Sequence, residues 1–336
     1  MAHALDIIGD IHGELPALRA LGQQLGYDVD HGWSHQQRRF PIFLGDLVDR
    51  GAHSLEVSEL VMGLVAQRRA ACIMGNHEYN LVAHHLNVPG YQRPKRSNTA
   101  TIAAITASPA RWAPVLRFFQ GLPVGINLPD LRLIHACWNI QSLALTAPLL
   151  GMPAPPTTFQ PVDTLDHVLG HVSVRSPFAL DGLIPGLPGD TLDEDADAPH
   201  EVLLKGFEVP TPTPFADNDG KVRHRVRAVW WEDGRHLVLT DKTQVFGHYW
   251  NTPPLDGHFA PPHPSGHPKL REWGDGMAAR CPPSGSIPLQ GDLACIDFNG
   301  ITRASQDRAC VGALRWPERD IVWASAEKTA SANAGD

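Results

Sequence analysis

The sequence predicts an α/β fold with two β-sheets, and three observations carry this prediction. Three successive units each combine an apolar strand, a polar loop and an amphipathic helix, with strands at residues 5–8, 40–44 and 71–74. Such units form a parallel sheet with right-handed crossovers. Later in the chain, short β-rich runs follow one another closely, which predicts a second, partly antiparallel sheet. The 336 residues, 43% of them hydrophobic, suffice for a large core.

The helices of the three units are predicted from apolar residues that recur at helical spacing. The first begins at Leu15, the second has Ser54 as its N-cap, and the third covers 79–86. In each unit the polar loop leaves the carboxyl end of its strand. Residues far apart in sequence can therefore meet at one edge of the sheet.

Further elements are predicted beyond the third unit. Two helices cover 99–107 and 110–120, and the second has a buried stripe of Trp112, Val115, Leu116 and Phe119. The predicted strands cover 124–128, 131–134, 222–231, 237–240, 244–246, 293–296, 309–316 and 321–323.

The length lies near the boundary between one large domain and two, and we expect one domain over residues 1–324. It carries insertions rich in proline and glycine near 181–199 and 253–288, and residues 325–336 form a flexible tail. The histidines of the later insertion are irregularly spaced in a proline-rich segment. They indicate a solvated loop rather than a metal site.

Composition excludes several classes of function. A net charge of -8 and a pI of about 6.1 argue against general nucleic-acid binding, which needs clustered basic residues. The sequence has no apolar run of membrane-spanning length and no leader pattern at residues 1–6, so we expect a cytoplasmic protein without a membrane partner. The five cysteines are scattered, with no metal-binding or disulfide pattern, and are predicted to be small core residues.

Polar residues gather where the predicted strands end. A mixture of carboxylate, imidazole and carboxamide groups without a thiolate suits manganese, iron or zinc better than calcium. The groups are more numerous than one ion requires, whereas two ions about 3.5 to 4 Å apart, bridged by a carboxylate, would use them all. They are Asp10 and His12, Asp46 and Asp49, Asn76 and His77, His135, and His248.

Five short motifs in order resemble those of the calcineurin-like metallophosphoesterase superfamily, in its phosphoprotein-phosphatase branch. The resemblance extends from about residue 5 to about residue 300 and implies a four-layer αββα sandwich, in which helices flank two mixed β-sheets. That branch includes bacterial serine/threonine phosphatases and diadenosine tetraphosphatase-like enzymes. The motifs are Gly9-Asp10-Ile11-His12-Gly13, Gly45-Asp46-Leu47-Val48-Asp49-Arg50-Gly51, Gly75-Asn76-His77-Glu78, His135 and Gly247-His248.

The resemblance also implies a role for each site residue. Asp10 and His12 would bind the first metal, Asp46 would bridge, and Asn76, His135 and His248 would bind the second. His77 would be the general acid, oriented by Asp49, and Arg50 would hold phosphate oxygens, with Asn76 and His77 also contacting substrate. The cofactor would be two divalent transition metal ions. Manganese is favoured, and iron, zinc, cobalt and nickel are alternatives.

These roles imply hydrolysis of a phosphate ester by a metal-bridging hydroxide. Phosphomonoesterase or protein-phosphatase-like activity on a phosphorylated small molecule or phosphoprotein is the favoured interpretation. A dinucleoside polyphosphate hydrolase is an alternative, for which Trp138, Tyr249 and Trp250 are candidate base-stacking residues. A catalytically inactive metal- or phosphate-binding scaffold is a third.

The sequence departs from the branch pattern after two of its motifs. Ala136-Cys137-Trp138 follows His135, and Tyr249-Trp250 stands where protein phosphatases commonly have Thr-Pro. Asp297 resembles a carboxylate that lies near the site in some relatives, and a turn aspartate is the alternative. The candidates for a second phosphate-binding arginine are Arg175, Arg223, Arg225 and Arg227.

Overall fold

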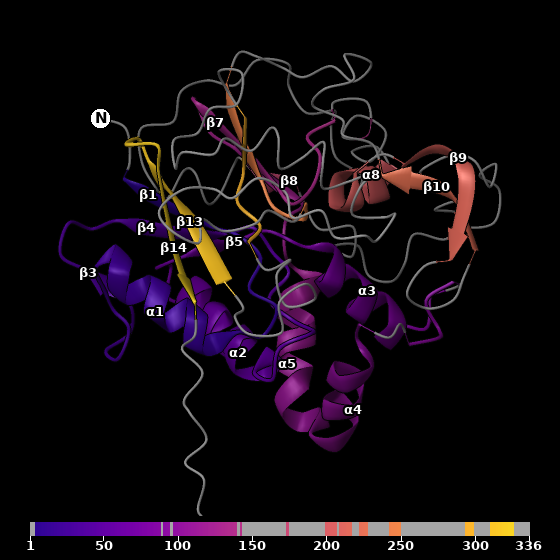
Figure 1. Ribbon diagram of the computed structural model, residues 1–336. Coiled ribbons are helices and arrows are strands. Elements are labelled where there is room, and N and C mark those ends of the chain that lie inside the picture. Colours follow the sequence, from indigo (N-terminus) through magenta and orange to yellow (C-terminus); the bar gives the residue numbers. More distant parts are fainter. Residues whose placement is uncertain are drawn as a thin grey trace, which may run out of the picture.

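The computed structural model shows a mixed α/β architecture with two five-stranded mixed sheets (Figure 1). It describes residues 4–88, 90–94, 97–139, 142, 173–174, 199–206, 208–216, 222–227, 242–249, 293–298 and 310–325.

The first sheet contains the three predicted units, in the strand order β14-β13-β1-β4-β5. Strands β1 (Leu5–Ile8), β4 (Phe40–Phe43) and β5 (Ala71–Cys72) are parallel, which confirms that prediction. Strand β13 (Cys310–Trp316) pairs antiparallel with β1, and β14 (Asp320–Ser325) pairs antiparallel with β13.

Five helices from the first 120 residues gather on one side of this sheet (Figure 1). Helix α1 contacts β13 and β14, α2 contacts β5, and α5 packs against α2, α3 and α4. Both helices predicted beyond the third unit are confirmed, including the buried stripe of the second. The helices are α1 (Leu15–Leu25), α2 (Ser54–Ala66), α3 (Asn76–His85), α4 (Thr99–Ala107) and α5 (Pro109–Gln120).

The second sheet has the order β12-β11-β7-β6-β8. Its β12, β11 and β7 are parallel, whereas β6 pairs antiparallel with β7 and β8. The short helix α8 (Pro199–Lys205) lies beside α3. The sheet consists of β12 (Leu293–Cys295), β11 (Thr243–Phe246), β7 (Leu131–Ile134), β6 (Gly125–Asn127) and β8 (Ser173–Val174).

A hydrophobic core fills the space between the two sheets. Ile7 and Ile42 from the first sheet meet Leu133 and Val245 from the second, and none is more than 1% exposed. Because successive strand residues point to opposite faces, Ile8 instead packs into the other core, with the helices. The described residues do not test the outer helix layer expected on the far face of the second sheet.

For several strands, the sheet predicted from the sequence was wrong. Strands β13 and β14 were expected in the second sheet but extend the first. Residues 222–227 form β10 (Val222–Arg227), which pairs with β9 (Glu208–Ala216) in a separate two-stranded sheet. Strands β2 (Tyr27–Asp28) and β3 (Ser34–His35) pair with each other in another two-stranded sheet. Strands β1 and β13 are distant in sequence, and neither strand carries a local signal of their pairing.

Other sequence predictions have mixed outcomes. Ser54 is the first residue of α2 rather than its N-cap, and its hydroxyl accepts the Asp49 amide instead. Four of the five cysteines are buried, as predicted, and Cys281 lies outside the described residues. The strand at 237–240, the insertion at 253–288 and residues 326–336 also lie outside them, as do residues 181–198. Among the described residues, no helix combines the length and apolar character that crossing a bilayer requires.

Candidate metal centre

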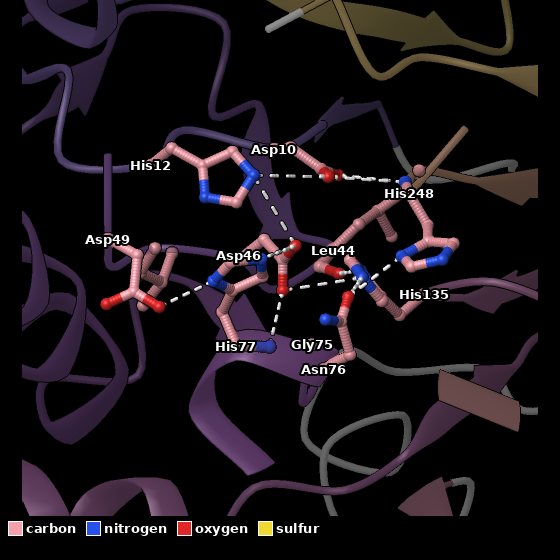
Figure 2. Close-up of polar contacts among 12 residues, drawn as sticks. Asp10, His12, Leu44, Asp46, Asp49, Gly75, Asn76, His77, His135 and His248 are labelled. Atoms are coloured by element: carbon pink, nitrogen blue, oxygen red, sulfur yellow. Dashed lines mark hydrogen bonds and ion pairs between the residues drawn. The ribbon is translucent and has the colours of Figure 1, made fainter. Parts of the chain in front are cut away.

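The predicted site residues meet at the carboxyl ends of strands from both sheets (Figure 2). Asp10 and His12 follow β1, Asp46 and Asp49 follow β4, and Asn76 and His77 open α3 after β5. His135 follows β7 and His248 follows β11. Each of these side chains belongs to a residue no more than 7% exposed, so the polar groups are concentrated in a site largely withdrawn from water.

The loops of the site adopt left-handed backbone conformations that non-glycine residues seldom take. His12, Asp46 and His248 have φ angles of 49°, 50° and 65°. Gly45, with φ 88°, lies so close to α3 that a Cβ there would be 2.3 Å from the Gly75 nitrogen. Such conformations persist only where surrounding contacts enforce them, and they are common at functional sites.

Glu78 enforces the conformation around Asp46, and the sequence analysis did not identify this role. Its carboxylate accepts hydrogen bonds from the amides of Asp46 at 2.7 Å, Leu47 at 2.8 Å and Gly75 at 3.0 Å. Burial, together with the nearby Asp46 charge, raises its pKa to about 7. The sequence does contain a signal for this role, because Glu78 is an acidic residue in the first turn of a helix, where its side chain can accept the N-cap amide.

The first cluster is centred on His12, and its ring geometry fits a cation. His12 Nδ1 lies 2.9 Å from the Val48 carbonyl, which can only accept, so Nδ1 carries the hydrogen. In the neutral ring Nε2 is then an acceptor, yet it faces Asp46 Oδ2 at 3.5 Å and Asp10 Oδ2 at 3.9 Å. Nε2 is buried without a hydrogen-bond partner among the described residues. A cation would satisfy all three acceptors, and a backbone carbonyl on the other ring nitrogen is typical of metal-binding histidines.

The second cluster joins His135, His248 and Asn76. His135 Nδ1 donates to the Leu44 carbonyl at 2.7 Å, so its Nε2 is directed at Asn76 Oδ1, 3.1 Å away, and Asp46 Oδ1, 3.4 Å away. His248 Nδ1 lies 2.8 Å from the same Asn76 oxygen. Adjacent ligand atoms that are each about 2.1 Å from one ion lie about 3 Å apart, so these spacings suit a shared ion.

Side chains whose potential ligand atoms lie within 4.8 Å of one another form groups that agree with the predicted ligand sets except at one position. One potential ligand atom from each of Asp46, His135 and His248 lies within 4.8 Å of the others, as expected for the second metal. Among the described residues, a second group of this kind contains His12, Asp46 and His77 rather than Asp10. Asp10 accepts the His248 amide at 3.2 Å and lies between the clusters, so its role as a ligand stays a prediction.

His77 and Asp49 form the predicted pair. His77 Nδ1 is 2.6 Å from Asp49 Oδ2, and the His77 amide donates to Asp46 Oδ1 at 2.9 Å. Asp49 is itself held by Ser54, whose hydroxyl accepts the Asp49 amide at 2.9 Å. These contacts fix the ring with Nε2 on the side of the metal clusters, 3.8 Å from Asp46 Oδ2.

Burial and crowding perturb the charges of the site. Burial and the carboxylates of Asp297 and Asp46 raise the pKa of Asp10, while burial and the charges of Arg50 and His77 lower the pKa of His12. Burial opposes ionisation of Asp46, but the His135 and His77 rings outweigh it and hold its pKa well below the usual range. Asp297 is fully buried and hydrogen-bonded to Asp10, so it lies at the site rather than in a remote turn.

The aromatic candidates for base stacking are not open platforms. Trp138 is 6% exposed and packs against the backbone of Gly125, and Tyr249 is 1% exposed, with its ring against Phe246. Trp250 lies outside the described residues. Of the candidate arginines, Arg225 donates to the Glu208 carbonyl at 2.6 Å, and the side chains of Arg175, Arg223 and Arg227 are not among those described.

Among solved structures, the chain shows similarity to a putative diadenosine tetraphosphatase and to a protein serine/threonine phosphatase from Saccharomyces cerevisiae. The first is 14% identical with a TM-score of 0.42, and the match covers 97% of this chain and 95% of that one. The second is 14% identical with a TM-score of 0.46, covering 97% and 80%.

Curated relatives match part of the chain. Over 73 residues the chain is 47% identical to the asymmetrical bis(5'-nucleosyl)-tetraphosphatase PrpE of Halalkalibacterium halodurans, covering 21% of this chain and 30% of the relative. Over 140 residues it is 34% identical to the protein of that name from Geobacillus thermodenitrificans, covering 39% and 56%. The chain thus spans less than two thirds of the length of these relatives.

One family profile matches residues 4–139, with the description calcineurin-like phosphoesterase. The matched stretch contains the motifs around Asp10, Asp46 and His77, together with His135. Residues 4–139 are therefore similar to the calcineurin-like phosphoesterase family.

Proposed function

We propose that the protein is a dinuclear metal-dependent phosphoesterase that hydrolyses phosphate monoesters. The observation that carries the proposal is the pair of clusters sharing Asp46, in which the Nε2 atoms of His12 and His135 face oxygen acceptors. Such a buried arrangement is unfavourable without a positive charge between the groups. A scaffold without catalytic activity would need no oriented proton donor, and the contact between His77 and Asp49 is the arrangement such a donor requires.

The residues around the two clusters would hold the metals. Two divalent ions there would polarise phosphate oxygens and make a nucleophile of water near neutral pH. The first ion would use His12 and Asp10, the second Asn76, His135 and His248, with Asp46 shared between them.

His77 is the proposed proton donor to the leaving group. The Asp49 carboxylate accepts from Nδ1 at 2.6 Å, which fixes the orientation of the ring. Nε2 then holds the transferable proton on the side of the clusters. A leaving alkoxide placed there would receive that proton as the ester bond breaks.

Arg50 supplies a fixed positive charge beside the first cluster. It follows Asp49 directly, and its charge helps to lower the pKa of His12. A guanidinium can bind two phosphate oxygens at once, and charge on those oxygens increases in the transition state. We therefore assign Arg50 to phosphate binding, with Asn76 and His77 completing the substrate side of the site.

A bis-nucleosyl tetraphosphate is the second candidate substrate, because the relatives named above are tetraphosphatases. The 73-residue match covers only 21% of the chain and 30% of the relative. It therefore supports the type of reaction more than the identity of the leaving group. The burial of Trp138 and Tyr249 removes two of the three stacking candidates for a nucleotide.

A substrate panel tests the proposal. We expect Mn²⁺-dependent hydrolysis of p-nitrophenyl phosphate and a phosphopeptide, with diadenosine tetraphosphate in parallel to decide between the candidates. Asp46→Asn should abolish the activity, whereas Glu59→Gln, on the exposed side of α2, should not. Absence of metal-dependent hydrolysis across the panel would contradict the proposal, and a strong preference for diadenosine tetraphosphate would establish the second candidate.

A further inference from the structure

Helix α8 contacts all three segments that carry the ligands of the second cluster. On the α3 side, His200 Nε2 lies 3.0 Å from the Tyr79 hydroxyl, and Tyr79 is one helical turn beyond Asn76. On the β7 side, the Leu203 carbonyl accepts the amides of Ala136 at 3.2 Å and Cys137 at 3.4 Å, directly after His135.

The third contact involves Tyr249, the residue after His248. The carboxyl end of α8 continues into Gly206, whose backbone lies against the Tyr249 hydroxyl so closely that a Cβ at Gly206 would be 1.7 Å from it. Gly206 has a φ of 76°, and its amide donates to the Val202 carbonyl at 2.9 Å. Only glycine fits here, so the helix end is fixed against the segment that carries His248.

The helix is itself firmly held. Val202, Leu203 and Leu204 are at most 3% exposed and belong to the larger hydrophobic core. On its polar side, Glu201 accepts from the Tyr91 hydroxyl at 2.9 Å and pairs with Lys205. A helix anchored in this way can transmit its position to the segments that it contacts.

The first cluster is positioned by other groups. His12 is oriented by the Val48 carbonyl, and the amides of Asp46 and Leu47 are held by Glu78. The two clusters thus share Asp46 but depend on different supports.

We propose that α8 is a positioning element for the second metal ion, acting through His200 on Tyr79 and through the backbone of Leu203 and Gly206. It sets the affinity of the Asn76, His135 and His248 cluster and leaves the affinity of the first cluster unchanged. Groups that orient ligands without touching the metal typically change its affinity by about 10- to 100-fold when removed. This inference rests on the dinuclear site of the proposed function.

Single-site backgrounds separate the two ions. His12→Ala disables the first cluster and His248→Ala the second, so calorimetric Mn²⁺ titration of each reports one ion. In the His12→Ala background, adding His200→Ala should weaken Mn²⁺ binding by about 10-fold. In the His248→Ala background it should change binding by less than about twofold. His200→Gln, which can still hydrogen-bond Tyr79, should restore most of the loss.

Two further variants distinguish loss of the contact between His200 and Tyr79 from general destabilisation of the fold. Tyr79→Phe removes only the hydroxyl that contacts His200, and it should weaken the second ion in the same direction. Val61→Ala, a buried change in α2, is the stability control and should leave the second ion's affinity unchanged.

The outcomes are distinguishable. If the unsubstituted protein binds fewer than two Mn²⁺ ions, the proposed function fails. If it binds two and His200→Ala and Tyr79→Phe leave the second affinity unchanged, or weaken both ions equally, the positioning role of α8 is overturned and the dinuclear site stands.

Discussion

At the residue scale, His77 differs from the other histidines of the site in its partner. Asp49 accepts from its Nδ1, whereas backbone carbonyls accept from the rings of His12 and His135. A carboxylate on Nδ1 orients the ring so that Nε2 is available for proton transfer, as in catalytic histidines that pair with an aspartate. We therefore interpret His77 as an acid, although its ring also falls in a geometric group with His12 and Asp46.

Replacing His77 by Asn tests this interpretation. Hydrolysis of an alkyl phosphate should fall by about 10²- to 10⁴-fold, because an alkoxide needs a proton as it leaves, and hydrolysis of an activated aryl phosphate should fall far less. Rates over a series of leaving-group pKa values, with metal content measured on the same samples, provide the check. Loss of metal from the variant would show that His77 is a ligand.

Glu78 yields a prediction about stability. Glu78→Gln places an amide NH₂ against backbone amides that now share a carboxylate, so buried donors lose acceptors. The free energy of unfolding should fall by about 1 to 3 kcal/mol. Urea unfolding measures it, with Glu56→Gln, an exposed change in α2, as the matched control. A loss no larger than that of the control would contradict the assigned role.

Residue types and order in the motifs predicted which side chains would converge, but not what surrounds each one. The positions of Asp10, Asp46 and His135 at strand ends could be inferred from alternation of strands and loops. The burial of Trp138 and Tyr249, by contrast, depends on contacts with Gly125 and Phe246 that no local pattern encodes.

At the element scale, α8 links stability to pH through His200. Burial lowers the pKa of His200 to about 4 from an ordinary 6.5, with Glu201 opposing the shift and Lys205 reinforcing it. Tyr79 faces the ring from α3, and Tyr91 contacts Glu201. Between pH 6.5 and 4 the unfolded chain binds a proton here that the folded chain does not, so this group makes stability fall as pH falls.

His200→Gln removes the titrating ring. The wild type should therefore lose more stability than the variant between pH 6.5 and 4.5, by about 2 kcal/mol. The pKa of Glu201, lowered to about 2 by Lys205 and His200 against the effect of burial, places its own contribution mainly below pH 4.5. Urea unfolding of both proteins at a series of pH values, in the same metal concentration, is the measurement. Parallel pH profiles would contradict the account.

Strand partners mark the limit of prediction at this scale. The parallel β1, β4 and β5 were predictable because short crossovers leave few alternative arrangements. Strand β13 begins at Cys310 yet pairs with β1, with Leu5 opposite Trp316. That pairing follows from the hydrophobic faces of the whole sheet, and nothing within residues 310–316 distinguishes one sheet edge from another.

At the scale of the whole molecule, two sheets and a shared core bring five strand ends to one place. Asp46 comes from the first sheet and His135 and His248 from the second, so the second cluster forms only when the sheets pack together. Metal binding and packing of the sheets should consequently stabilise one another.

This coupling predicts that removal of metal destabilises the fold. Thermal unfolding of the Mn²⁺-loaded protein should occur at a higher temperature than that of the chelated protein, because an ion that binds only the folded state stabilises it. Asp46→Asn should reduce the difference, since Asp46 is shared by both clusters. An unchanged difference in that variant would indicate that the stabilising ion binds elsewhere.

The central claim is that the site holds two metal ions around Asp46, and metal stoichiometry tests it most directly. Elemental analysis of the Mn²⁺-saturated protein should give about two equivalents per chain, and activity in a stepwise titration of the chelated protein should reach its maximum only as the second equivalent binds. A reproducible single equivalent with full activity would contradict the dinuclear account.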